Sequence, residues 1–106
     1  MSKSTGRDEP TREEIDQTKG PVLLEFGASW CGHCRALEPQ LAEELDPFPE
    51  IRHIKIDDAS ERRLGRSFGV SLWPTLVFLR DGHILKEAVR PHREEIRQGL
   101  ETIANP

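Results

Sequence analysis

The sequence predicts an α/β domain in which helices cover both faces of a central mixed sheet. Two near-continuous apolar stretches, "VLLEFGA" (22–28) and "TLVFLRD" (75–81), are typical of strands buried on both faces. Segments with helical spacing of apolar residues lie between these strands and after the last one. This order of strands and helices favours a mixed sheet with a helical layer on each side.

The first helix is predicted over "REEIDQTK" (12–19). Thr11 stands directly before it and Glu14 follows three residues later, which is the pattern of a capping box. Gly20-Pro21 should end this helix, and the first apolar strand follows at 22–28.

A second helix is predicted from about Cys31 to Glu44. Pro39 inside it should kink it, because proline has no backbone N–H to donate. Apolar residues recur along it every four positions: Leu37, Leu41 and Leu45.

The second half of the chain predicts three strands and two helices. "IRHIKID" (51–57) alternates between apolar and polar residues as a strand does, and a short helix is predicted over Ala59–Phe68. Asp81-Gly82 should join the apolar strand 75–81 to "HILKEAV" (83–89) in a hairpin. A closing helix is expected over Arg93–Ile103.

Length and charge bound the possible functions. The 106 residues suit one domain, which we expect at 11–106 after a flexible tail at 1–10. A net charge of −4 argues against nucleic acid or anionic membranes as partners, and we interpret Arg62, Arg63 and Arg66 as a solvated helix face. The first twenty residues are polar and no apolar run is long enough to span a membrane, so a cytoplasmic location is expected.

The chain has only two cysteines, both in "SWCGHCR" (29–35). As a structural disulfide they would close a very small loop, which constrains the unfolded chain little. A zinc site needs about four ligands, but His53, His83 and His92 are scattered and no second C-x-x-C occurs. Two thiolates alone suit a soft ion such as Cu(I), which stays a remote alternative.

Thiol–disulfide exchange is the third and preferred interpretation of the pair. The motif follows a buried strand and opens a helix, so Cys31 should lie at the helix N-terminus, where free N–H groups and the helix dipole stabilise a thiolate. Cys34, three residues on, should lie on the same side of the helix and one turn deeper. Gly32 permits close approach by a partner, and a protonated His33 would lower the pKa of Cys31 and make the couple more oxidising.

"VLLEFGASWCGHCRALEP" and "IDDASERRLGRSFGVSLWPTLVFLRDGHIL" together resemble the thioredoxin family over roughly residues 11–104. The resemblance implies the thioredoxin fold, with Cys31 as nucleophile and Cys34 as resolving thiol. It also implies a cis-proline at Pro74 and a substrate groove formed by Trp30, Trp73, Pro74, Thr75 and Arg90.

Glu25 falls where the family keeps a buried acid beneath the resolving cysteine. A carboxylate within an apolar run suits a proton acceptor for Cys34, although an exposed strand residue is the alternative. Disulfide isomerases share Cys-Gly-His-Cys and a glutamate at these positions, whereas ordinary thioredoxins usually have Cys-Gly-Pro-Cys with an aspartate.

Several positions depart from the family pattern. Residues 2–7 lack a strand pattern, so the first edge strand is expected to be missing or frayed. Gly27 replaces a bulky aromatic residue, which should loosen packing near the motif. His53 stands where a lysine is common, and it either couples to Glu25 or is a surface histidine. Trp73 either narrows the groove or completes the core.

Arg90 replaces a glycine of the family's substrate groove, and its charge should bias the choice of partner. The function expected is a protein-disulfide oxidoreductase, most simply a reductase, that needs no bound cofactor or metal and acts as a monomer. Its partners would be disulfide-containing proteins and a recycling enzyme. The alternatives are a disulfide oxidase or isomerase in an oxidising compartment, or a non-enzymatic interaction module.

Overall fold

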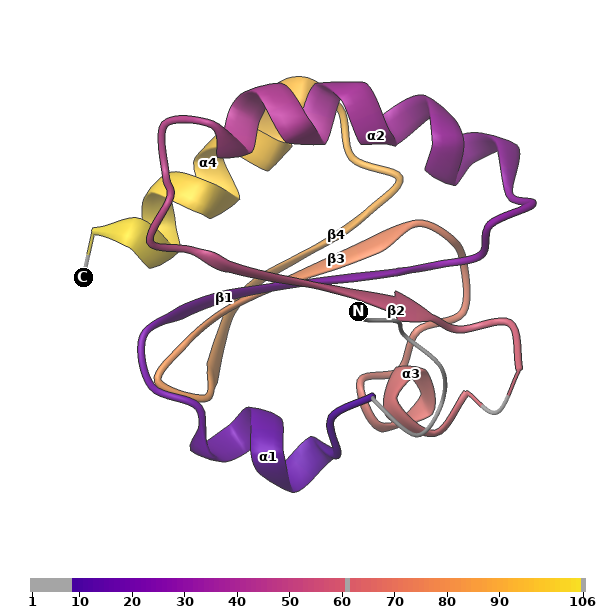
Figure 1. The fold of residues 1–106 in the computed structure, drawn as a ribbon, viewed down its shortest axis with the longest axis horizontal. Helices are drawn as coiled ribbons and strands as arrows, with labels where there is room; N and C mark the ends of the chain where they lie inside the picture. Colours follow the sequence, from indigo (N-terminus) through magenta and orange to yellow (C-terminus); the bar gives the residue numbers. More distant parts are fainter. Residues whose placement is uncertain (1–8, 61, 106) are drawn as a thin grey trace.

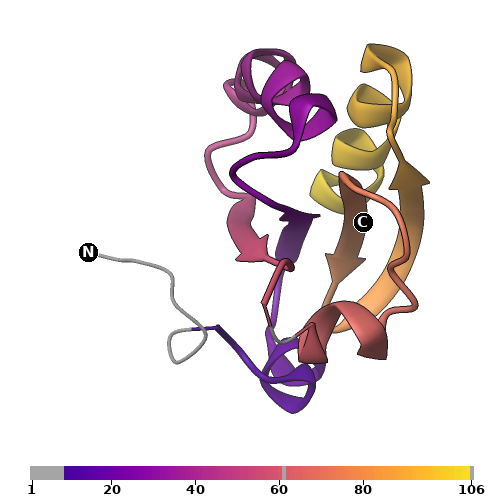
Figure 2. The same cartoon turned by 90° about the vertical axis from the view of Figure 1, so that its right-hand side faces the viewer.

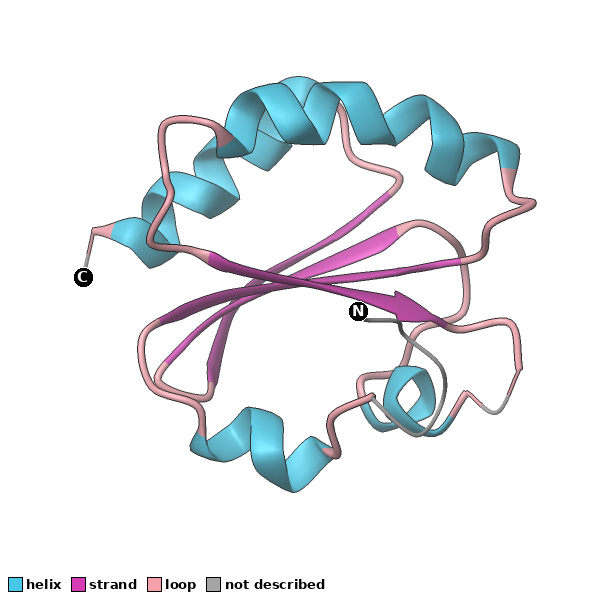
Figure 3. Cartoon of the chain, viewed as in Figure 1, coloured by secondary structure: helices cyan, strands magenta, loops and turns pink. Residues whose placement is uncertain are grey.

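The computed structural model describes residues 9–60 and 62–105 and contains one four-stranded sheet (Figures 1 and 3). The strands are β1 (Pro21–Gly27), β2 (Arg52–Asp57), β3 (Thr75–Arg80) and β4 (His83–Val89), in the order β2-β1-β3-β4. Strand β1 runs parallel to β2 and antiparallel to β3, and β3 is antiparallel to β4. The sheet is therefore mixed, as predicted.

Among the described residues, four helices cover the two faces of this sheet. Helices α1 (Arg12–Gln17) and α3 (Arg63–Ser67) lie on one side, and α2 (Gly32–Leu45) and α4 (Arg93–Ala104) lie together on the other (Figures 1 and 2). None of the helices in the described ranges is long and apolar enough to cross a membrane.

Each face of the sheet carries its own apolar core, because successive strand residues point to opposite sides. One core lies between the sheet and helices α1 and α3, and the other lies between the sheet and helices α2 and α4. On the α1 and α3 side the buried residues are Ile15, Val22, Leu24, Phe26, Ile56, Leu64, Phe68, Val70, Val77 and Leu79. On the α2 and α4 side they are Leu23, Leu37, Leu41, Ile51, Leu76, Phe78, Ala88, Ile96, Leu100 and Ile103.

The capping box predicted at the first helix is present. The Thr11 hydroxyl accepts the backbone N–H of Glu14, whose carboxylate accepts the N–H of Thr11. Arg12 then links α1 to α3: its guanidinium lies 4.0 Å from the centre of the Phe68 ring and donates to the carbonyl of Ser67. The charged side chain of Arg12 thus connects the two short helices, α1 and α3.

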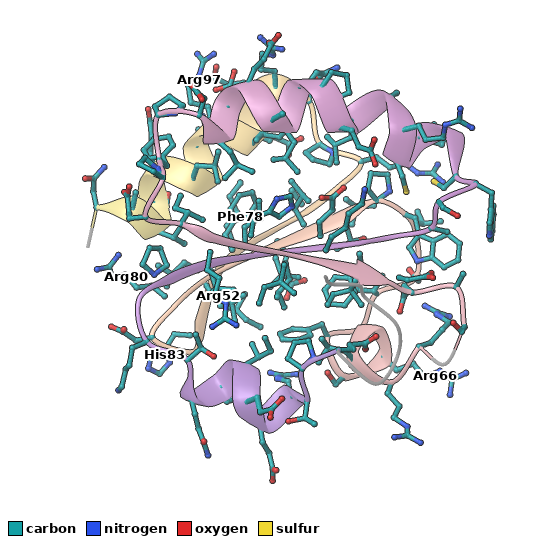
Figure 4. The ribbon with its side chains drawn as sticks, in the orientation of Figure 1. Arg52, Arg66, Phe78, Arg80, His83 and Arg97 are labelled. Carbon is teal, nitrogen blue, oxygen red and sulfur yellow. The ribbon has the colours of Figure 1, made fainter. Side chains whose placement is uncertain are left out.

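An ion pair at the surface connects α2 with α4, and α4 packs onto the sheet. Arg97 of α4 binds both carboxylate oxygens of Glu44 on α2, each at 3.1 Å. Below this contact Gly99 lies against the ring of Phe78, which Figure 4 shows between the sheet and the helices. Pro39 lies inside α2, as expected.

The hairpin predicted at Asp81-Gly82 joins β3 to β4. Both turn residues have positive φ, 53° at Asp81 and 81° at Gly82, as a tight two-residue hairpin turn requires. The Asp81 carboxylate accepts the N–H of Gly20, which fastens the turn to the start of β1.

One helix boundary is corrected by the structure. The helix predicted over Ala59–Phe68 is only α3, Arg63–Ser67. The chain turns after β2, where the Asp57 carboxylate accepts the N–H of Ala59, and Arg62 has a φ of 62° that no helix tolerates. The strand proposed as missing at 2–7 and most of the predicted tail at 1–10 lie outside the described residues.

Candidate functional site

The cysteine motif connects the end of β1 to the start of α2. Cys31 is the N-cap of α2, and its sulfur accepts the backbone N–H of Cys34 at 3.2 Å. Both cysteines are free thiols; Cys31 is 8% exposed and Cys34 4%. The predicted placement is confirmed, with Cys31 outermost and Cys34 one turn deeper.

The two thiols differ in acidity. Burial opposes ionisation of Cys31, but hydrogen bonds from the thiol and N–H of Cys34 and from the N–H of His33, with the charge of Arg90, outweigh it and lower its pKa below 9.0. Burial, together with the hydrogen bond to Cys31 and the negative charge of Glu25, raises the pKa of Cys34 to about 11. The pair therefore combines an outer thiol of lowered pKa with an inner thiol of raised pKa.

Glu25 is buried on the same face of the sheet as α2, only 2% exposed. Its carboxylate oxygen lies 2.8 Å from Nε2 of His53 on β2, whose side chain is 32% exposed. Of the two possibilities open for His53 in the sequence, the structure thus gives the coupled one. The imidazole links a buried carboxylate to the protein surface.

An open groove of about 400 Å³ leads to Cys31. We call it the Cys31 groove. Trp30 and Trp73 meet in it edge to face, with ring centres 5.4 Å apart. Trp73 also packs against the buried cluster that Ala28, Cys31 and Cys34 form, so it both shapes the groove and completes the core. The residues lining the groove are Trp30, Cys31, Gly32, Arg62, Ser71, Leu72, Trp73 and Arg90.

The Trp73–Pro74 peptide bond is cis, as the resemblance implies. Pro74, His33 and Arg90 line a smaller hollow of about 160 Å³. Thr75 is buried, and its hydroxyl donates to the carbonyl of Leu72 at 2.6 Å. Thr75 therefore supports the segment that forms the groove from below.

Arg90 reaches back over the cis-proline segment. Its N–H donates to the carbonyl of Pro74 at 2.9 Å and its Nε to the carbonyl of Trp73 at 2.8 Å. Its φ of 49° lies in the left-handed region that favours glycine.

Gly27 lies directly against the second cysteine. A Cβ at this position would lie 2.6 Å from the sulfur of Cys34, so the missing side chain makes room for that thiol. Gly27 also lines an open cavity of about 360 Å³, whose rim includes Lys55 and Glu38, an ion pair between β2 and α2. The expectation that Gly27 loosens the packing is wrong on the side of Cys34, where the glycine and the thiol are in close contact.

Sequence reasoning missed Asp58. This carboxylate is 1% exposed and accepts hydrogen bonds from Nε1 of Trp73 at 2.8 Å and from Nε of Arg62 at 3.3 Å. The spacing of Asp58 and Arg62, four residues apart, was the available signal. Its meaning was obscured by an equally acidic neighbour, Asp57.

The interpretation of Arg62, Arg63 and Arg66 as one solvated helix face needs correction. Arg62 turns inward, because Asp58 and the carbonyl of Val70 accept its donors, whereas Arg66 lies at the periphery (Figure 4). Across the residues that the structure describes, no three His, Cys, Asp or Glu side chains cluster in a way that would hold a metal ion.

Chemically, this arrangement suits the making and breaking of disulfide bonds. A sulfur whose pKa is lowered lines an open groove. A second thiol lies within hydrogen-bonding reach of the first, and a carboxylate influences the ionisation of that second thiol.

Comparison with known proteins agrees with this chemistry. Residues 4–102 match the family model described as Thioredoxin. A thioredoxin H-type of Ricinus communis is 34% identical over 85 residues, 80% of this chain and 72% of that protein. The solved reduced form of thioredoxin 2 from Pseudomonas aeruginosa PAO1 is 48% identical with a TM-score of 0.80, covering 91% of this chain and 90% of that one.

A protein disulfide-isomerase of Gallus gallus is 43% identical over 65 residues, which are 58% of this chain but 13% of that protein. The family model covers nearly the whole chain, and the fold and the paired cysteines agree with it. The chain belongs to the thioredoxin family.

Proposed function

We propose that this thiol–disulfide oxidoreductase reduces disulfide bonds in protein substrates, with Cys31 as nucleophile and Cys34 as resolving thiol. One observation carries the assignment of roles. The pKa of Cys31, at the mouth of an open groove, is lowered, while that of Cys34 beneath it is raised to about 11.

The proposed cycle moves two electrons to the substrate. The Cys31 thiolate attacks one substrate sulfur, which forms a mixed disulfide and releases the other sulfur as a thiolate that takes up a proton. Cys34 loses its proton and attacks Sγ of Cys31, which releases the second substrate thiol and leaves a Cys31–Cys34 disulfide. A recycling reductase must return two electrons before the next turnover.

Glu25 is the proposed acceptor of the Cys34 proton, and His53 passes that proton to solvent. This is supported by the 2.8 Å contact between the two side chains and by the effect of Glu25 on the pKa of Cys34. We expect Glu25→Gln to slow resolution at least about tenfold and the first attack much less, in single-turnover assays. Glu43→Gln, an exposed charge on α2, should change neither rate. Equal slowing of both steps by Glu25→Gln would remove Glu25 from the resolution step.

The direction of electron flow is tested by the reduction potential of the Cys31–Cys34 couple together with insulin reduction. A potential near about −270 mV with active reduction supports the reductase, and a potential near about −180 mV favours the oxidase or isomerase. The exposed imidazole of His33 is the residue proposed to set this value, with Gly32 leaving the approach to Cys31 open. Loss of turnover with partner binding retained in Cys31→Ser would mark an interaction module.

The Cys31 groove is the proposed binding site for substrate, with Trp30, Trp73 and Pro74 contacting an extended segment. The charge of Arg90 should favour substrates with an acidic side chain near the disulfide. Because the cytosol keeps thiols reduced, a reductase suits that compartment, and we propose a cytoplasmic location. We propose separately that the protein acts as a monomer.

A further inference from the structure

Asp58 is a buried carboxylate that the redox cycle does not use. It follows β2, and its N–H donates to the carbonyl of Gly27 at 2.8 Å, next to the cysteine motif. Gly65 packs so tightly on it that a Cβ there would lie 2.2 Å from Oδ1. Backbone and packing therefore hold the carboxylate in one place.

One oxygen of this carboxylate holds two walls of the Cys31 groove. Oδ2 accepts from the indole of Trp73 at 2.8 Å and from the guanidinium of Arg62 at 3.3 Å. Both donors line the groove but come from different segments, Arg62 from the start of α3 and Trp73 from the loop before β3. Their separation is thus fixed by a shared acceptor.

Stability alone does not account for this acceptor. Oδ1 is buried and has no hydrogen-bond partner among residues 9–60 and 62–105. A buried carboxylate with an unsatisfied oxygen costs free energy, whereas an apolar residue of similar size would not. What the carboxylate does provide is the orientation of the Trp73 ring, which packs against the cluster that contains the two cysteines and meets Trp30 edge to face.

We propose that Asp58 is a positioning residue for substrate binding, which sets the shape of the Cys31 groove through Trp73 and Arg62. It acts on the binding of a protein disulfide and leaves the intrinsic reactivity of the Cys31 thiolate unchanged. This inference rests on the proposed reductase function.

The test compares two substrates of different size. Insulin must occupy the groove, whereas bis(2-hydroxyethyl) disulfide needs only access to the sulfur of Cys31. We expect Asp58→Ala to raise KM for insulin about tenfold, because two hydrogen bonds to a charged group are lost, with the rate on the small disulfide unchanged. Asp58→Asn should recover part of the loss, since its amide oxygen still accepts the indole N–H. Glu87→Gln, an exposed charge on β4, is the control and should change neither rate.

A second variant tests the same contact from the other side and avoids altering the buried carboxylate. Trp73→Phe keeps a ring but loses the N–H, and it should raise KM for insulin more in the wild-type background than in Asp58→Ala, because the Asp58–Trp73 hydrogen bond is already lost in the second case. In Trp30→Phe, where Trp73 is the only tryptophan, Asp58→Ala should shift the fluorescence emission.

The proposal is overturned if, in folded protein, Asp58→Ala leaves KM for insulin unchanged or slows both disulfides equally. It is also overturned if the effects of Asp58→Ala and Trp73→Phe on KM for insulin are additive in the double variant. If Asp58→Ala does not fold, additive behaviour of Asp58→Asn and Trp73→Phe decides against it in the same way. A wild-type protein that reduces neither disulfide would overturn the reductase function, whereas a wild type that reduces both leaves that function standing whatever Asp58 does.

Discussion

Arg90 shows how a single residue combines backbone strain with electrostatics. A non-glycine residue in the left-handed region costs roughly 1–2 kcal/mol. Arg90 has a φ of 49°, yet its guanidinium lowers the pKa of Cys31 and its Nε holds the carbonyl of Trp73. The arginine therefore keeps a local strain that a glycine would relieve, and it places a positive charge beside the reactive sulfur.

Replacing Arg90 should separate these two effects. Arg90→Gly and Arg90→Ala should both raise the pKa of Cys31, followed by thiolate absorbance, while Arg90→Lys retains most of the lowering. The glycine variant should be more stable to urea than the alanine variant by about 1 kcal/mol, because only glycine adopts a positive φ without strain. Equal unfolding midpoints for the two variants would show that the backbone at this position is not strained.

At this scale, local patterns were predictable and long-range contacts were not. Cys31 and Cys34 stand out because their spacing and their place before a helix are local facts. The pairing of Glu25 with His53 depends on the register of β1 against β2, which no local pattern specifies. Asp58 lies beside Asp57, and only the fold decides which of the two carboxylates is buried.

At the scale of elements, α4 packs closely against β3 where a glycine faces an aromatic ring. A Cβ at Gly99 would lie 2.4 Å from the Phe78 ring, so the helix approaches the sheet where it has no side chain. Glycine in a helix interior normally costs about 1 kcal/mol relative to alanine. At Gly99 this cost in helix propensity is accepted because the absence of a side chain lets α4 pack against the Phe78 ring.

Gly99→Ala should consequently destabilise the protein by about 1–3 kcal/mol, since overpacking outweighs the gain in helix propensity. Gly32→Ala is the matched control: it lies in the first turn of α2 with nothing within 4 Å of an added Cβ, and it should be neutral or mildly stabilising. Urea unfolding curves of the two variants make the comparison. A stabilised Gly99→Ala would mean that α4 moves away from Phe78 at no cost.

The number and type of these elements followed from apolar periodicity, but one boundary did not. Residues 59–62 have helical composition, and the prediction extended the helix through them. The inward turn of Arg62 towards Asp58 gives a positive φ there, so the helix begins at Arg63. The contacts of Arg62 with Asp58 and with the carbonyl of Val70 accompany this departure from local propensity.

For the molecule as a whole, two apolar cores lie on opposite faces of one sheet. The cysteine motif begins α2, which covers one of these cores. Cys34 is almost fully buried there, and its pKa is raised from 9.0 to about 11. The native state therefore keeps a proton that the unfolded chain releases above pH 9, so the site affects the stability of the entire domain.

The sign of this effect is fixed. A pKa raised on folding contributes stability that is complete below pH 9 and is lost as pH rises through 11. We expect the free energy of unfolding of Cys31→Ala to fall between pH 9 and 11 by at most about 3 kcal/mol more than that of Cys31→Ala/Cys34→Ala. Urea titrations across this range measure the difference, and parallel pH profiles for the two variants would contradict it.

The N-cap of α2 gives the redox chemistry a second consequence. The sulfur of Cys31 that attacks a disulfide is also the acceptor that secures the first turn of the helix through the N–H of Cys34. A cap of this kind is worth about 0.5–2 kcal/mol, and a charged sulfur accepts better than one already bound to another sulfur. We therefore expect each turnover to weaken and then restore this hydrogen bond, so that the stability of the first turn of α2 differs between the oxidised and the reduced enzyme.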